Sequence, residues 1–192
     1  MTLTRIDDKA ALIVVDLQKA LTATTVPLLH PVAEIVGRAS RLAAAFRTRG
    51  LPVVLVNATG SAPGRTEVGS HAGSTLPADL TEILPELDPQ PSDIRVSKRT
   101  WGAFHNTPLD DHLRGLGVTQ VVIVGVATSV GVESTARAAH EHGYHVVLAT
   151  DAMTDGSVEA HDNSIGRIFP RVGETATTEE VLQQVGESPQ AL

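Results

Sequence analysis

The fold class is decided by a short apolar run, Ala11-Leu12-Ile13-Val14-Val15, that ends abruptly at Asp16. An unbroken run of this kind, without polar alternation, is typical of a strand buried on both faces in a parallel sheet covered by helices. It is far too short to cross a membrane, and no targeting segment is recognisable before it. We therefore expect a cytoplasmic protein without a membrane partner.

Further apolar runs alternate with helical patterns along the rest of the chain. The next predicted strands cover residues 52–57, 94–97, 120–125, 145–150 and 172–175. The predicted helices cover residues 31–50, 107–115, 131–142 and 157–170, and a last helix begins at a capping box of Thr177 and Glu180. Such alternation predicts right-handed βαβ units. We expect a single α/β domain over residues 1–192, with a frayed tail at 183–192.

The composition excludes several classes of function. The chain of 192 residues has a net charge of -7, which argues against nucleic-acid binding, because that needs excess Lys and Arg on one face. It contains no cysteine. Disulfides, thiolate metal sites and a cysteine nucleophile are therefore excluded, and any chemistry must use other side chains.

Polar features follow several of the predicted strands. Ligands of open parallel sheets bind beyond the carboxyl ends of the strands. At those ends the chain places Asp16, Lys98, residues 125–131 and Asp151. A carboxyl group at the end of a buried strand needs a partner or keeps its proton, and Lys98 is the expected partner of Asp16. The alternative is a structural Asp16 that accepts backbone N–H groups.

The stretch from Gly125 to Gly131 joins a predicted strand to a helix. Its backbone N–H groups and the positive end of the helix dipole predict an anion-binding turn, with Ala127, Thr128 and Gly131 as binding residues. No Gly-Lys-Ser/Thr follows this turn, and no dinucleotide glycine fingerprint follows the first strand. Nucleotide binding is therefore not favoured.

Side chains with rings give weaker indications. Trp101 and Phe104 follow the third strand closely and either form a wall of the pocket or pack a loop. His71 and His105 lie in loops near the expected cleft, where ligand contact and plain surface are both open. Solvated surface is favoured over a metal site for the three histidines around a helix end, His140, His142 and His145.

A set of motifs stands out when these stretches are taken together. They are Val14-Val15-Asp16-Leu17-Gln18, Lys98 with Trp101-Gly102-Ala103-Phe104, Thr107-Pro108-Leu109, Gly125-Val126-Ala127-Thr128-Ser129-Val130-Gly131-Val132-Glu133-Ser134-Thr135-Ala136, and Gly143-Tyr144 before Asp151-Ala152. The set resembles the isochorismatase-like hydrolases over about residues 8–182. The resemblance implies a Rossmann-like three-layer α/β/α fold with a six-stranded parallel sheet. It also implies a small-molecule substrate and a homo-oligomer, either a dimer or a tetramer.

The same resemblance assigns site residues. Most members of this family are cysteine hydrolases that act on amides and have an aspartate, a lysine and a cysteine in the site. By motif position Asp16 corresponds to the aspartate, Lys98 to the lysine and Gly131 to the cysteine. The family's non-proline cis peptide bond would fall at Val126–Ala127.

Gly131 changes the expected mechanism. Glycine supplies neither a nucleophile nor a general base, and Thr128 and Ser129 are displaced too far along the chain to replace a thiolate. The isochorismatases proper also lack a nucleophile there, and they cleave a vinyl ether. In that chemistry Asp16 would be the general acid that protonates the enolpyruvyl methylene carbon, and Lys98 would hold the acid and a substrate carboxylate.

A second departure concerns metal. Nicotinamidase-like members place an Asp-x-His group after the second strand, whereas here Asn57-Ala58-Thr59-Gly60 follows, with no acid until Glu67. We expect neither a metal ion nor a cofactor. In the Pro- and Gly-rich segment 58–93, Thr59 and Arg65 are the expected substrate contacts, Arg65 because a guanidinium pairs well with a carboxylate. A plain surface arginine is the alternative.

Three interpretations are open at this point. The first is an enzyme, a cysteine-less hydrolase in which Asp16 cleaves an enol ether such as isochorismate and releases pyruvate; an amidase with a non-cysteine mechanism is its variant. The second is a degenerate family member that binds a small carboxylate or amide without turnover. The third is that Gly131 replaces a native cysteine, which the smooth sequence around it disfavours.

Overall fold

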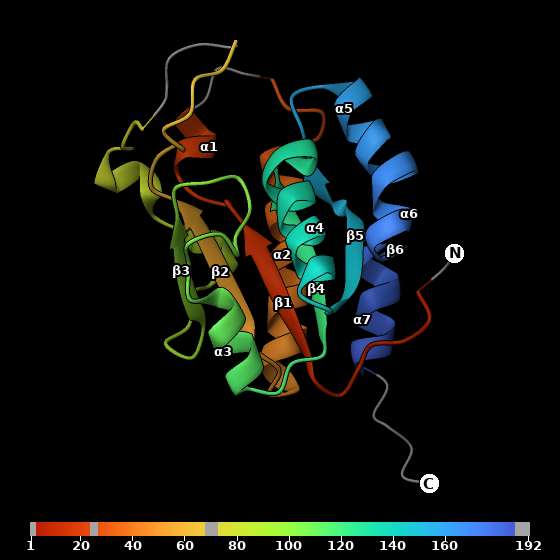
Figure 1. The fold of residues 1–192 in the computed structure, drawn as a ribbon. Helices are drawn as coiled ribbons and strands as arrows, with labels where there is room; N and C mark the ends of the chain where they lie inside the picture. The colour runs from red at the N-terminus through yellow and green to blue at the C-terminus, as the bar shows by residue number, and fades with distance from the viewer. Residues whose placement is uncertain (1–2, 24–26, 68–72, 187–192) are drawn as a thin grey trace, which may run out of the picture.

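Six parallel strands form one sheet in the order β3-β2-β1-β4-β5-β6 (Figure 1). The computed structural model describes residues 3–23, 27–67 and 73–186. The strands are β1 Ala10–Val15, β2 Val53–Ala58, β3 Ile94–Lys98, β4 Gln120–Val126, β5 His145–Thr154 and β6 Glu174–Ala176. The expected six-stranded parallel sheet is therefore confirmed, with each strand within a few residues of its predicted place.

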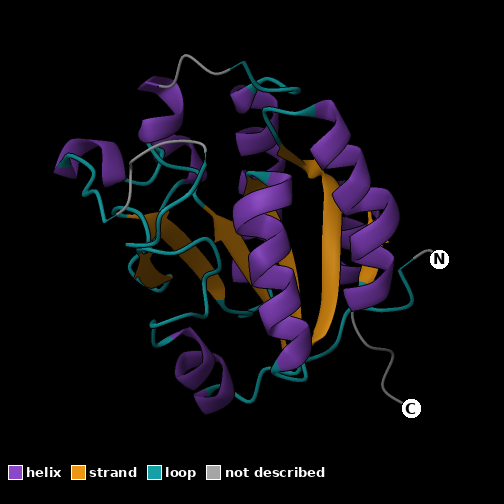
Figure 2. Cartoon of the chain, turned by 45° about the horizontal axis from the view of Figure 1, so that its top comes forward, coloured by secondary structure: helices purple, strands orange, loops and turns teal. Residues whose placement is uncertain are grey.

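Helices cover both faces of this sheet (Figure 2). Helices α2 Val32–Thr48 and α7 Thr178–Gly186 pack on one face, and α3 Leu109–Gly115, α4 Glu133–Glu141 and α6 Phe169–Val172 pack on the other. The shorter helices α1 and α5 span Ala20–Ala23 and Val158–Asn163. None of the helices in the described ranges is long and apolar enough to span a bilayer. The three-layer α/β/α architecture is the one that the sequence predicts.

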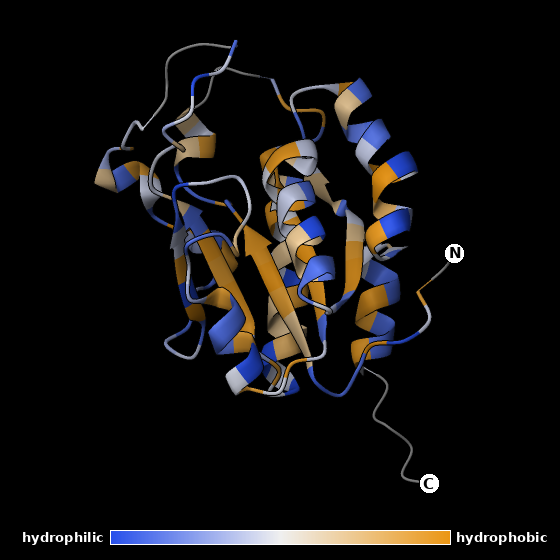
Figure 3. Cartoon of the chain, viewed as in Figure 1, coloured by the Kyte–Doolittle hydropathy of each residue, from blue (hydrophilic) through white to orange (hydrophobic). Residues whose placement is uncertain are grey.

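Strand β1 belongs to both hydrophobic cores at once. All six of its residues are buried, and Figure 3 shows apolar colour along its length. Leu12 and Val14 pack in the core beneath α2 and α7, whereas Ile13 and Val15 pack in the core beneath α3 and α4. Successive side chains of a strand point to opposite faces, so a strand covered on both sides must be apolar throughout. Each of these buried side chains contributes about 1.5–3 kcal/mol to folding.

The order of the strands reverses between β1 and β4. Strands β2 and β3 extend the sheet on one side of β1, and β4, β5 and β6 extend it on the other. The carboxyl ends of β1 and β4 therefore border the crevice in which open parallel sheets bind their ligands. The two strands approach closely there, because a Cβ on Gly125 would lie 2.1 Å from the carbonyl oxygen of Val15.

Strand β5 is longer than the sequence predicts. The apolar run stops at Thr150, but the strand continues through Asp151 to Thr154. Its register against β4 shifts between Ile123 and Gly125. The prediction that Asp151 closes the strand is therefore wrong, because the strand resumes pairing beyond the irregularity.

Two predictions about the C-terminal part also need correction. The helix predicted over residues 157–170 does not end at Pro170, because the helical backbone continues from η4 Ser164–Ile168 into α6 and ends at Val172. Residues 183–186 belong to α7 and not to a frayed tail, and residues 187–192 lie outside the described residues. The capping box is confirmed, since the Thr177 N–H donates to Glu180 at 2.7 Å and the Glu180 N–H donates to Thr177 Oγ1 at 3.2 Å.

We expect Gly125→Ala to lower the free energy of unfolding by about 3 kcal/mol or more, because the methyl group meets strand β1. The φ of +123° at this residue adds strain for any L side chain. Gly37→Ala in α2 is the matched control, because its Cβ would meet nothing within 4 Å. It should stabilise the protein by up to about 1 kcal/mol through helix propensity. Urea unfolding curves measure both, and equal stabilities would contradict the close approach of β1 and β4.

Candidate active site

An ion pair between Asp16 and Lys98 lies at the carboxyl edge of the sheet. Asp16 follows β1 directly and Lys98 ends β3, with β2 between the two strands. The Lys98 Nζ donates to Asp16 Oδ2 at 2.6 Å and to the Thr100 carbonyl at 3.1 Å. The side chain of Lys98 is 2% exposed and that of Asp16 is 18% exposed. The structure therefore forms the ion pair that the sequence predicts, and it is largely shielded from water.

The backbone turns sharply at Asp16. Its φ of 55° is left-handed, a conformation that Asp tolerates better than most residues. The Asp16 N–H still donates to the Val56 carbonyl at 2.9 Å, so the turn begins while the residue is bonded to β2. Gln18, which is buried, bonds both the N–H and the carbonyl of Ala58 through its side-chain amide. These bonds hold the carboxyl group of Asp16 over the end of the sheet.

The environment of Asp16 raises the pKa of its carboxyl group. Burial raises the pKa of this carboxyl from 3.8 to about 6, although the Lys98 ammonium pulls in the opposite direction. Its Oδ1 is buried and has no hydrogen-bond partner among the described residues. An unpartnered buried carboxyl oxygen is unusual, and a proton on it would be free to move to a ligand.

Gly131 faces the same carboxyl group. It lies in a π-helical turn, η3 Thr128–Val132, that follows a cis peptide bond between Val126 and Ala127. A Cβ at Gly131 would lie 3.3 Å from Asp16 Oδ2 and 3.0 Å from the Val126 carbonyl. The structure thus brings together the three positions that the sequence singles out, with the side-chain-free one beside the acid.

The turn after β4 is less open to anions than the sequence predicts. The Ser129 N–H donates to Asp155 Oδ2 at 2.7 Å. The N–H groups of Val130 and Val132 both donate to the Ala127 carbonyl. The expectation of a row of unpaired N–H groups is therefore wrong for these three residues, because protein oxygens already accept from them.

The side chain of Thr128 is likewise engaged inside the protein. It is fully buried, and its hydroxyl lies 2.9 Å from His161 Nδ1. Burial, and after it the neighbouring His30, lowers the pKa of His161, so this imidazole is neutral at pH 7. The Thr128 hydroxyl therefore has no access to a ligand, and any contact with substrate at this residue would involve its backbone.

A cavity of about 400 Å³ opens beside Lys98. Its lining comes from the ends of β2 and β3 and the loops that follow them: Thr59, Ser61, Ala62, Pro63, Ser97, Lys98, Arg99, Thr100, His105 and Asn106. Two of these side chains are cationic and none is acidic. In a chain with a net charge of -7, such a lining favours an anionic ligand.

Of the predicted substrate contacts, some line this cavity and others do not. Thr59 lines the cavity, and its N–H donates to the Lys98 carbonyl at 2.9 Å. Arg65 is exposed and Trp101 is 63% exposed, and neither lines this cavity. Phe104 is not a wall of the cavity, because its ring is buried and stacks on His142 at 5.1 Å. The loop after β3 folds that ring into the core beneath α3 and α4.

Sequence reasoning missed Arg99. Its guanidinium donates to the carbonyl oxygens of Gly73 and Ser74 and to the Thr75 hydroxyl, which holds the returning arm of the loop after β2. A Cβ at Gly60 would lie 2.1 Å from the Ser74 carbonyl, so the two arms pack without space for a side chain. The only sequence indication was the position of Arg99 directly after Lys98.

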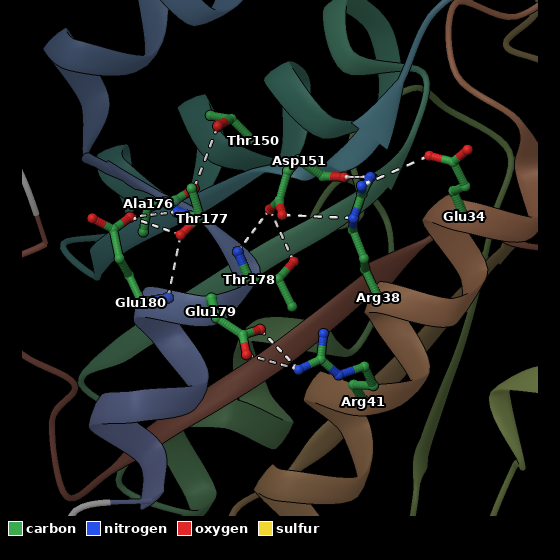
Figure 4. A network of polar contacts seen from close by, with 10 residues as sticks. All are labelled: Glu34, Arg38, Arg41, Thr150, Asp151, Ala176, Thr177, Thr178, Glu179 and Glu180. Atoms are coloured by element: carbon green, nitrogen blue, oxygen red, sulfur yellow. Dashed lines mark hydrogen bonds and ion pairs between the residues drawn. The ribbon is translucent and has the colours of Figure 1, made fainter.

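Asp151 lies in a separate polar network, as Figure 4 shows. Its Oδ1 accepts from the Thr178 N–H at 2.7 Å and from the Thr178 hydroxyl, at the start of α7. The Arg38 guanidinium of α2 donates to the Asp151 carbonyl at 2.7 Å. Asp151 therefore anchors the two helices of one face and is not part of the cluster around Asp16.

The three histidines for which the sequence favours solvated surface are at the surface. The three around the end of α4, His140, His142 and His145, are exposed, and His71 lies outside the described residues. His105 lines the cavity beside Lys98. Within residues 3–23, 27–67 and 73–186, no group of three or more His, Asp or Glu side chains is arranged to hold a metal ion.

Comparison with known proteins agrees with this geometry. The fold and site together define an α/β protein of the doubly wound class, with a buried carboxyl–lysine pair where its strand order reverses. The isochorismatase domain profile matches residues 10–180. The chain therefore belongs to the isochorismatase family, and it is a hydrolase of that family.

Individual relatives cover almost the whole chain. The uncharacterized isochorismatase family protein YwoC of Bacillus subtilis is 40% identical over 183 residues, covering 92% of this chain and 94% of that protein. The ureidoacrylate amidohydrolase RutB of Methylobacterium radiotolerans is 32% identical over 181 residues, covering 81% and 70%. The structure of an isochorismatase family protein from Burkholderia thailandensis superposes with a TM-score of 0.89 at 34% identity, covering 95% and 98%.

We expect a ¹³C NMR titration of the Asp16 carboxyl carbon to give a midpoint at about 6. In Lys98→Met the midpoint should rise further, because the cation that lowers the pKa is gone while the burial remains. Lys19→Met, which removes an exposed ion pair with Glu82, is the control and should leave the midpoint unchanged. An ordinary midpoint near 3.8 in the unaltered protein would show that Asp16 is hydrated.

Proposed function

We propose that this hydrolase cleaves the vinyl ether bond of a small enolpyruvyl carboxylate such as isochorismate, with Asp16 as the general acid. One observation carries the proposal: the buried Oδ1 of Asp16 has no partner among the described residues, in a carboxyl group whose pKa is raised to about 6. A proton on that oxygen is available to a substrate, and Gly131 places no side chain beside the carboxyl group. The reaction class is hydrolysis without a protein nucleophile.

The chemistry follows from the protonation of the substrate. Asp16 transfers its proton to the methylene carbon of the enolpyruvyl group, which leaves an oxocarbenium ion on the adjacent carbon. Water adds to that carbon and returns a proton to the Asp16 carboxylate. The hemiketal hydroxyl then gives up its proton as the bond to the oxygen attached to the ring breaks, and that oxygen takes up a proton. One molecule of water has thereby converted the ether into an alcohol and pyruvate.

Lys98 has two functions in this scheme. Its bond to Oδ2 stabilises the carboxylate that forms when Asp16 gives up the proton. An ammonium group has three donors, and two of those of Lys98 are used by Asp16 and Thr100. The third is available to a substrate carboxylate in the adjoining cavity, whose lining is cationic.

The hydroxyl groups near Gly131 support a mechanism without covalent attack. Besides the bond between Thr128 and His161, the Ser129 hydroxyl donates to Asp155 Oδ2 at 2.8 Å. Both hydroxyl groups are bonded within the protein and stand two or three residues before Gly131 in the chain, so neither occupies the place of the missing thiolate. Neither side chain is arranged as the nucleophile of an acyl-enzyme.

A second candidate function is hydrolysis of a small amide by water, with Asp16 as the base. It is favoured by the relatives, because ureidoacrylate amidohydrolase is a family member at 32% identity. The absence of cysteine weighs against it, because a direct attack of water on an amide lacks the thioester step. Binding of a small carboxylate without turnover, a homo-oligomeric state and a cytoplasmic location stay predictions.

Incubation with isochorismate and related enol ethers should release pyruvate, measured by a coupled lactate dehydrogenase assay. We expect Asp16→Asn to lower kcat/KM by at least about a hundredfold, because the amide cannot supply the proton. Asp111→Asn, an exposed acid in the first turn of α3, is the matched control and should retain full activity. Ammonia from an amide panel, with no pyruvate from any ether, would favour the second candidate instead.

The pH dependence of kcat/KM should have a descending limb with a midpoint at about 6. The acid must be protonated to act, so activity is present below this pH and falls about tenfold for each further pH unit above it. Steady-state rates between about pH 4.5 and about pH 8.5 test the sign. Activity that rises with pH through this interval would identify Asp16 as a base and contradict the ether mechanism.

A further inference from the structure

The side chain of Asp155 bonds the turn that carries Gly131. One carboxylate oxygen, Oδ2, accepts both the Ser129 N–H at 2.7 Å and the Ser129 hydroxyl at 2.8 Å. The other oxygen, Oδ1, accepts the Ser157 N–H at 3.2 Å. Asp155 lies just beyond the end of β5, so it connects the end of that strand to the turn after β4.

Asp155 is buried, with 6% of its surface exposed. Among the described residues it forms no ion pair with a lysine or arginine, so its oxygens are satisfied by N–H and O–H donors alone. A buried carboxylate without a cation is costly unless its hydrogen bonds are strong and well placed. The turn between β4 and α4 leads into the N-terminus of a helix, where backbone N–H groups carry partial positive charge and supply such donors.

The backbone of Asp155 adds a third connection. Its carbonyl accepts the Leu29 N–H at 2.9 Å, which ties in the segment before α2. A separate bond between Thr128 and His161 joins the same turn to α5. The turn is thereby fixed to segments that are far apart in the sequence: Asp155 connects it to Leu29 and Ser157, and His161 connects it to α5.

The position of this turn decides what lies beside Asp16. A Cβ at Gly131 would be 3.3 Å from Asp16 Oδ2, so the backbone at Gly131 covers part of the acid. A small outward movement of the turn would admit water to the carboxyl group and widen the space in which a substrate is held. Misplacement by about 1 Å can cost a hundredfold in rate.

We propose that Asp155 is a positioning residue, whose carboxylate holds the turn 127–131 against Asp16 and keeps the reacting end of the substrate aligned with the acid. The kinetic part of this proposal rests on the proposed function, whereas the structural part does not. Asp155 does not touch the reacting atoms; it acts through Ser129.

A carboxylate suits this position better than an amide does. Both oxygens of Asp155 accept from N–H or O–H donors, two on one oxygen and one on the other. Asparagine has a single acceptor oxygen, so its NH₂ group would face either Ser129 or Ser157, each of which is a donor. Asp155→Asn therefore loses bonds at one end while it keeps the size of the side chain.

The test compares Asp155→Asn with Ser157→Ala. The control loses the Ser157 hydroxyl that accepts from the Ala160 N–H and caps α5, but it keeps the backbone bond to Asp155. Both variants should melt at a lower temperature. Only Asp155→Asn should lower kcat for pyruvate release, by about ten- to a hundredfold, with KM within about twofold of the unaltered value.

The titration of Asp16 gives a readout that does not need turnover. Water that reaches the carboxyl group in Asp155→Asn should move its NMR midpoint down from about 6, because burial is the main cause of the raised pKa. Removal of the Asp155 charge acts in the same direction, so Ser129→Ala is included. This variant keeps the charge and loses one bond to the turn, and it should show a smaller fall in the midpoint.

The outcomes separate the two proposals. No pyruvate from the unaltered protein, together with a lowered midpoint in Asp155→Asn and Ser129→Ala, would overturn the proposed function and support the positioning residue. An unchanged kcat and midpoint in Asp155→Asn, or equal losses in Ser157→Ala, would overturn the positioning residue. If Asp155→Asn does not fold, the midpoint in Ser129→Ala decides, and no change there contradicts the proposal.

Discussion

The burial of a carboxyl group against a single ammonium is the interaction around which this site is arranged. Neither Asp16 nor Lys98 could be buried alone, because an isolated charge in the interior costs several kcal/mol or more. Together they need the end of β1 and the end of β3 at a separation that one lysine side chain can span. Because Lys98 bonds to Oδ2, the other oxygen of Asp16 has no partner among the described residues, and it is the oxygen that would carry the proton of the proposed acid.

The rigidity of β1 makes that arrangement possible. The strand lies at the centre of the sheet, pairs with β2 and β4, and fills a core on each face. A residue at the end of such a strand has little freedom to move toward water. The turn of Gly131 completes the enclosure from the side of β4, and Asp155 connects it to segments beyond β5.

The pair of Asp16 and Lys98 could be predicted because parallel strands deliver their carboxyl ends to one edge of the sheet. The placement of Phe104 could not, because the loop after β3 returns its ring to the core near His142, whereas spacing from Lys98 suggested the pocket. The turn after β4 was expected to offer its N–H groups to an anion. The Ser129 N–H instead donates to Asp155, which lies 26 residues further along the chain. A local pattern contains no information about a partner at that separation.

The sequence by itself determined the parallel α/β fold, the six strands, the absence of thiol chemistry and the acid and lysine at two strand ends. These follow from apolar periodicity and residue identity, which act over a few neighbouring residues. Only the tertiary structure decided which oxygen of Asp16 is unpartnered, which N–H groups of the turn are already occupied, and that Arg99 borders the cavity while Arg65 does not. Those outcomes depend on contacts between distant segments and on burial, and both arise only when the whole chain packs.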